Sequence, residues 1–217
     1  MRNGATSLLC AIALLGCSDA GQGDATTPTL PDPFIERVVS FTPGDDASFG
    51  HDQLPDIVKG PPKGAGACKG SLDAVSLGVG GEIVVEMGMT IVDGPGPDFI
   101  VFENAFIAGC QGDESQIYAE PAEVSVSEDG ESWHVFPCTA TEYPYGSCAG
   151  WRAVHSHPDG DIEPLDVEKA GGDPFDLAEI GVERARFVRI RDMKSAKGGP
   201  PSAGFDLDAI AVVNGED

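Results

Sequence analysis

Residues 123–136 have the sequence EVSVSEDGESWHVF, two runs of alternating apolar and polar residues separated by Asp129-Gly130. A period of two is typical of a half-buried strand, and an Asp-Gly pair between two such runs favours a tight turn. The stretch therefore predicts an antiparallel β-hairpin. Four residues are expected to face the core: Val124, Val126, Trp133 and Val135.

Strand patterns recur on both sides of this hairpin. Residues 82–87 (EIVVEM) alternate, so Ile83, Val85 and Met87 should face inward and Glu82 and Glu86 outward. Residues 99–102 (FIVF) predict a central strand buried on both faces. With 29 Gly and 17 Pro and no long helix-forming run, the chain is predicted to be mostly β, an antiparallel β-sandwich with long loops. Further strands are expected at 34–41, 151–154, 184–190 and 207–213.

One short helix is predicted after residues 170–172. Asp173 precedes Pro174, and Gly181 follows Ile180, which is the pattern of an N-cap, a first helical position and a C-terminal stop. Alternatively, Asp173 projects its carboxylate from a turn toward a hard cation such as calcium. Both interpretations stay open at this level.

The hairpin and residues 185–190 (ARFVRI) resemble discoidin-type, galactose-binding-like jelly-roll domains. Over residues 70–213 the chain resembles more closely a group of uncharacterised bacterial cell-surface proteins with that fold. The resemblance implies an eight-stranded sandwich and often a bound calcium ion. Residues 205–208 (FDLD) replace the usual apolar strand of discoidins, so the ligand loops of discoidins are not carried over.

The N-terminus predicts export and lipid anchoring. Arg2 precedes the apolar run 5–16, and Leu14-Leu15-Gly16-Cys17 resembles the bacterial lipobox, in which the peptide is cut before a cysteine that is then acylated. We expect a signal peptide over 1–16, lipidated Cys17 with a flexible tether over 17–33, and one domain over 34–217. This predicts attachment to a bacterial membrane, at the outer membrane or cell surface; the alternative is an ordinary signal peptide with a chance cysteine.

Charge and cysteines narrow the choice of partners and compartment. The chain has 36 Asp plus Glu against 13 Lys plus Arg, a formal charge of −23, so nucleic acid is not an expected partner. Four cysteines remain besides Cys10 and Cys17. Cys138 and Cys148 bracket a short loop and should pair, which leaves Cys68 with Cys110; free thiols or a metal site are the alternatives.

Seven oxygen-bearing residues are candidate calcium ligands: Asp98, Glu103, Asn104, Asp173, Asp176, Asp206 and Asp208. Asp206 and Asp208 are two apart and would share one face of a strand. A calcium ion there would stabilise the loops and offset part of the negative charge. Alternatively, these carboxylates accept backbone hydrogen bonds or pair with Arg186, Arg189 and Arg191.

Loop aromatics Tyr143, Tyr145 and Trp151 could stack on sugar rings, or could cover one end of the sandwich. No Gly-x-Ser-x-Gly or His-Glu-x-x-His motif is present, and no catalytic residue is assigned. We therefore expect a non-catalytic, calcium-stabilised surface module that binds carbohydrate or another surface protein. The alternatives are a structural envelope component without a small ligand and a carboxylate-dependent glycoside hydrolase.

Overall fold

The computed structural model describes Met1 and residues 31–110, 113, 116–194 and 198–217. The predicted signal peptide, Cys17 and nearly all of the tether lie outside this part of the chain. Pro31–Asp217 forms one compact unit.

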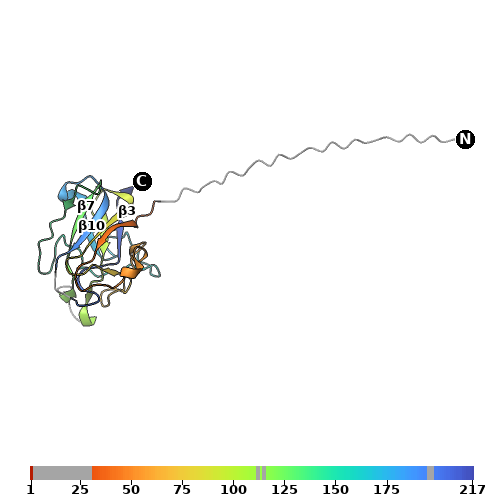
Figure 1. The fold of residues 1–217 in the computed structure, drawn as a ribbon. Helices are drawn as coiled ribbons and strands as arrows, with labels where there is room; N and C mark the ends of the chain where they lie inside the picture. The colour runs from red at the N-terminus through yellow and green to blue at the C-terminus, as the bar shows by residue number, and fades with distance from the viewer. Residues whose placement is uncertain (2–30, 111–112, 114–115, 195–197) are drawn as a thin grey trace. The chain divides into compact units, whose positions relative to one another are not determined.

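An antiparallel six-stranded sheet forms one layer of the fold. Its strand order is β1-β3-β10-β7-β8, with β13 also paired to β3, and Figure 1 shows β3, β10 and β7 side by side. The strands are β1 (Ile35–Thr42), β3 (Glu82–Val92), β7 (Ala122–Ser127), β8 (His134–Val135), β10 (Arg184–Asp192) and β13 (Gly215–Glu216).

A smaller antiparallel sheet, in the order β12-β4-β9, forms the second layer. It consists of β4 (Phe99–Phe102), β9 (Asp173–Phe175) and β12 (Ala209–Val212), and two strand pairs extend the fold: β2 (Val75–Ser76) with β11 (Asp206–Leu207), and β5 (Phe106–Ile107) with β6 (Ile117–Tyr118). The described helices are 3₁₀ turns: η1 (His51–Gln53), η2 (Asp56–Val58), η3 (Ala108–Cys110) and η5 (Leu177–Ile180). The fold is a mostly β, antiparallel sandwich, as predicted.

The main core lies between the two sheets. Ile83, Val85 and Met87 of β3 are buried there, which confirms the alternation predicted for this strand. Phe99 and Val101 of β4 face the same core, whereas Ile100 and Phe102 belong to a second apolar cluster with Val154 and Ala170. The loop before β9 thus covers the outer face of the small sheet, and this explains the four consecutive apolar residues of β4.

Three local predictions were wrong. Val135 is 45% exposed and Trp133 is only partly buried, because β8 is a two-residue edge strand and Phe136 enters the core instead. The cap of the short helix is Asp176, which accepts a hydrogen bond from Ala178 N, while Asp173 begins β9. The strand expected over 151–154 is reduced to a single bridge between Val154 and Gly171.

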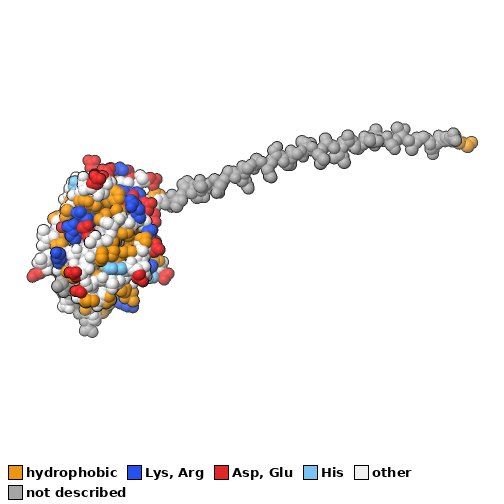
Figure 2. All heavy atoms as spheres, viewed as in Figure 1, with side chains coloured by type: hydrophobic (Ala, Val, Ile, Leu, Met, Phe, Trp, Pro, Cys, Tyr) orange, Lys and Arg blue, Asp and Glu red, His pale blue; other side chains and the backbone are white. Residues whose placement is uncertain are grey.

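The outward face of the large sheet is charged. Arg186 contacts Glu36 and Glu86, and Arg191 contacts Glu82 and Glu123, so strands β1, β3, β7 and β10 are linked across the face by ion pairs. Figure 2 shows basic, acidic and apolar side chains mixed over the visible face. Ion pairs at such exposure contribute little stability individually, although each of these two arginines is paired with two acids.

Candidate functional site

Three buried carboxylates meet where strands of different sheets end. Glu103 follows β4, Glu120 precedes β7 and Asp206 begins β11; one oxygen from each lies within 4.8 Å of the others. Their exposed fractions are 2%, 4% and 5%. We call Glu103, Glu120 and Asp206 the carboxylate cluster.

Hydrogen bonds satisfy only part of the carboxylate cluster. Ser76 Oγ donates to Asp206 Oδ1, and Asn104 Nδ2 donates to Asp206 Oδ2 at 3.3 Å. Glu103 Oε2 and Asn104 Oδ1 are buried and have no hydrogen-bond partner in the described structure. Two buried oxygen acceptors therefore lack a donor among the described residues, and the one on Glu103 belongs to a residue beside two other carboxylates, which is costly unless a cation or a proton compensates.

The electrostatics of the cluster favour a cation. Burial raises the pKa of Glu103 well above its ordinary value, and the negative charges of Asp206, Glu120 and Asp173 raise it further. Burial also raises the pKa of Asp206, partly offset by its bonds from Ser76 and Asn104. Such shifts mean that ionised carboxylates are destabilised here unless positive charge is supplied.

The donor set fits calcium. Carboxylate oxygens are ligands that this ion takes in proteins, and three carboxylates can supply much of its coordination shell. A narrow hollow that includes Gly70, Glu103, Asn104 and Val154 opens beside Glu103.

The other predicted calcium ligands are separated from the carboxylate cluster. Asp98 accepts hydrogen bonds from Gly94 N, Leu177 N and Asn214 Nδ2, so it organises turns. Asp176, which caps η5, lies near Asp98 and the exposed Asp93.

Asp208 accepts from Lys63 N at 3.0 and 3.2 Å, and burial raises its pKa to about 7. Asp206 and Asp208 therefore accept hydrogen bonds in different networks.

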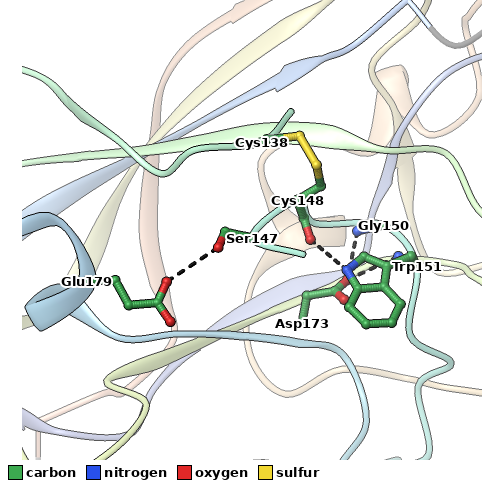
Figure 3. The surroundings of a disulfide bond; sticks show 7 residues. All are labelled: Cys138, Ser147, Cys148, Gly150, Trp151, Asp173 and Glu179. Carbon is green, nitrogen blue, oxygen red and sulfur yellow. Dashed lines mark hydrogen bonds between the residues drawn. A yellow bond between two sulfur atoms is a disulfide. The ribbon is translucent and has the colours of Figure 1, made fainter. Parts of the chain in front are cut away.

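Asp173 lies between the cluster and a neighbouring loop. Its Oδ2 accepts hydrogen bonds from Gly150 N at 2.7 Å and Trp151 N at 3.2 Å, as Figure 3 shows. Burial raises the pKa of Asp173 to about 7, while the bonds from Trp151 and Gly150 and the charge of Arg152 lower it. Asp173 holds the backbone of the segment that carries Trp151.

A cleft of about 470 Å³ lies beside this segment. Its walls combine apolar and polar side chains with the backbone of Gly171 and Gly172. The lining side chains are Ala67, Ile107, Ile117, Tyr143, Trp151, Arg152, Ala153, His155, Val167 and Glu168. The volume is that of a small-molecule pocket.

The aromatic residues differ in their access to the cleft. Tyr143 and Trp151 line it, with ring centroids 5.6 Å apart. Trp151 is 8% exposed, its Nε1 donates to Cys148 O, and Arg152 lies over its ring at 4.7 Å. Tyr145 is 9% exposed and is not part of the lining, because it packs with Cys138, Cys148 and Trp151 in a small cluster. Of the three predicted ligand-binding aromatics, two reach the cleft.

Both predicted disulfides are present, Cys68–Cys110 and Cys138–Cys148. The first joins segments next to Ala67 and Ile107, and the second closes the loop that carries Tyr143 and ends close to Trp151 (Figure 3). The bonds therefore constrain both walls of the cleft.

Sequence reasoning assigned no role to Glu120, Arg152 or Glu168, and it favoured a plain loop histidine at His155. The run Glu120-Pro121-Ala122 does not predict that Glu120 is buried, because a Glu before a proline usually lies exposed in a loop. Arg152 follows a predicted ligand-binding Trp, and that adjacency was the available signal.

In the described part of the chain, no helix has the length and apolarity needed to cross a membrane. No protein-family model matches the chain, and no curated protein matches it.

Proposed function

We propose that this chain is an exported, lipid-anchored envelope protein whose β-sandwich binds carbohydrate at the bacterial surface without catalysing a reaction. The observation that carries the proposal is the cleft beside Trp151. Tyr143 and Trp151 supply aromatic surface, while Arg152, His155 and Glu168 supply charged and hydrogen-bonding groups. Sugars present both apolar C–H faces and hydroxyl groups, so they need this combination.

The cleft is also preorganised. The disulfides constrain its two walls, and the Trp151 backbone is fixed by Asp173. A site that is ordered before binding loses less conformational entropy when a ligand arrives. This favours recognition of a weakly interacting ligand such as a saccharide.

We further propose that calcium binds the carboxylate cluster and stabilises the domain. The unpartnered Glu103 Oε2 supports this, since it is a buried oxygen of a residue whose carboxylate lies beside two others. A cation would compensate the burial and the repulsion that together raise the pKa of Glu103.

Glycan-array binding by oxidised residues 18–217 in calcium tests the ligand. Tyr143→Ala and Arg152→Ala should each weaken binding of the selected glycan by at least about tenfold, which is the cost of losing a stacked or charged contact. Trp133→Ala is the matched control, because Arg189 lies over Trp133 at 4.5 Å in the same type of contact away from the cleft. The proposal would be rejected if the native chain and the three variants bound the glycan with equal affinity. It would also be rejected if the native chain bound no glycan.

A further inference from the structure

Asp173 connects the carboxylate cluster to the cleft. One of its oxygens accepts from the Gly150 and Trp151 amides, and the other, Oδ1, has no hydrogen-bond partner in the described residues and lies 3.9 Å from Arg152 Nε. Trp151 and Arg152 both line the cleft. A single buried carboxylate thus holds the Trp151 backbone (Figure 3) and lies within ion-pair distance of Arg152.

The same segment is attached to the cluster through Glu120. Glu120 N donates to Gly150 O at 3.0 Å, and a Cβ on Gly150 would lie 2.3 Å from Glu120 O. Gly150, at φ +90°, is therefore closely packed between Glu120 and Asp173. A shift of the Glu120 backbone or of the Asp173 carboxylate should therefore displace the Trp151 backbone, because Gly150 is closely packed between them.

Electrostatic interactions also connect Asp173 with the carboxylate cluster. The charge of Asp173 acts unfavourably on Glu103, and Glu103 lies next to Glu120 and Asp206. Without a cation, Glu103 is repelled by three neighbouring acids in a medium that screens poorly. A divalent cation beside Glu103 would favour the ionised form of Asp173, which burial disfavours, and hydrogen bonds from the Gly150 and Trp151 amides to a charged acceptor are the stronger kind.

We infer that a divalent cation at the carboxylate cluster fixes Trp151 and Arg152 through Asp173, so that ligand binding in the cleft depends on calcium. This inference rests on the proposed function. The coupling is indirect, because Glu103, Glu120 and Asp206 do not line the cleft. Asp173 is a positioning residue in this scheme.

Coupling between two sites is reciprocal. Calcium should raise ligand affinity, and ligand should raise calcium affinity by the same factor, typically about 5- to 150-fold. The effect on Trp151 should be visible with calcium alone, because the ion acts on the cleft wall before any ligand binds.

The test uses calcium as the only probe and Trp151 as the reporter. The chain contains two tryptophans, so Trp133→Phe leaves Trp151 as the single indole. In oxidised residues 18–217 with this substitution, calcium binding is followed by calorimetry, and Trp151 emission and acrylamide quenching are measured in parallel. Asp173→Asn keeps an oxygen acceptor for the two amides but removes the charge. Asp208→Asn is the control, because Asp208 is buried but contacts Lys63 instead.

We expect calcium to shift Trp151 emission and to reduce its quenching at least twofold, with the same midpoint as the binding heat. Asp173→Asn should still bind calcium, yet show no change at Trp151, and Asp208→Asn should behave like the parent. Calcium binding with an unchanged Trp151 signal, or a full response in Asp173→Asn, would overturn the coupling and leave the metal site intact. Absence of any binding heat would reject the metal site itself, and the coupling with it, while the glycan assay would still judge the cleft.

Discussion

Asn104 Nδ2 donates a 3.3 Å hydrogen bond to Asp206 Oδ2, although 102 positions separate the two residues. The bond joins the segment after β4 to the first residue of β11, in two different sheets. The amide nitrogen of Asn104 thus satisfies one oxygen of Asp206, whereas Glu103 Oε2 is buried without a hydrogen-bond donor in the described part of the chain. Hydrogen bonds therefore neutralise the carboxylate cluster only in part, which supports the proposed cation.

Calcium should stabilise the domain through the carboxylate cluster. At roughly 100 times its dissociation constant, a bound ion adds about 2.7 kcal/mol, or about 5–10 °C in Tm for a domain of this size. Glu103→Gln should remove this gain, and its Tm in chelator should match or exceed the native value because repulsion is relieved. Differential scanning calorimetry with and without calcium measures both effects. A full calcium response in Glu103→Gln would contradict the assignment, and Asp208→Asn should retain the response.

The metal-free domain should lose stability as pH rises from about 4 to about 7. Burial raises the pKa of Asp173 and of Asp208 to about 7, and the pKa values of Glu103 and Asp206 are also raised. In this window the folded state binds more protons than the unfolded chain, so the free energy of unfolding falls with increasing pH. Asp129 acts in the opposite direction, because its pKa is lowered to about 2 in the folded state. Its contribution to stability grows between about pH 2 and its ordinary pKa of 3.8, which is below this window.

Urea midpoints in chelator at about pH 5 and about pH 8 test this sign. The midpoint should be lower at the higher pH, and calcium should reduce the difference because metal binding requires ionised carboxylates. A midpoint that rises with pH in chelator would show that these acids are not buried as described.

The two disulfides should differ in their contribution to stability. Cys138–Cys148 spans 10 positions and Cys68–Cys110 spans 42. Constraint of the unfolded chain predicts about 3 kcal/mol for the shorter loop and about 4 kcal/mol for the longer one. Paired Cys→Ser variants, compared by urea unfolding, measure each contribution. A larger loss from the short loop would show that native contacts around Trp151 outweigh chain entropy.

Gly150→Ala should be far more costly than Gly146→Ala. Both glycines have positive φ, +90° and +61°, so each alanine variant has backbone strain of about 1–2 kcal/mol. Only at Gly150 would the new Cβ meet a backbone oxygen, that of Glu120, at 2.3 Å, whereas at Gly146 nothing lies within 4 Å. Thermal unfolding of the two variants isolates the clash. Equal losses would mean that the Gly150 segment can move away from Glu120.

Period and composition were sufficient to predict the strands that carry the fold. β3 alternates because one face covers the core, and β4 is apolar throughout because a loop covers its second face. In β8 the alternating pattern did not predict burial correctly. An edge strand of two residues buries little surface, so Val135 remains exposed. Local alternation is informative only where a neighbour on each side fixes the strand.

The candidate site was less predictable. Glu103, Asn104 and Asp206 could be nominated as oxygen ligands at strand ends, but which acids meet depends on contacts between distant segments. Asp208 lies two residues from Asp206 and still contacts Lys63 instead. Glu120 lies in the cluster because the segment that carries it pairs with a distant one, Ala122 with Ala149 and Glu120 with Gly150. No local sequence pattern predicts this pairing.

The placement of the disulfides ties the cleft to the redox state of its surroundings. Core residues between the sheets do not depend on them, whereas both cleft walls do. Reduction should therefore loosen the cleft as well as lower the stability of the whole domain. Under the proposed function, full affinity at the cleft would require an oxidising environment.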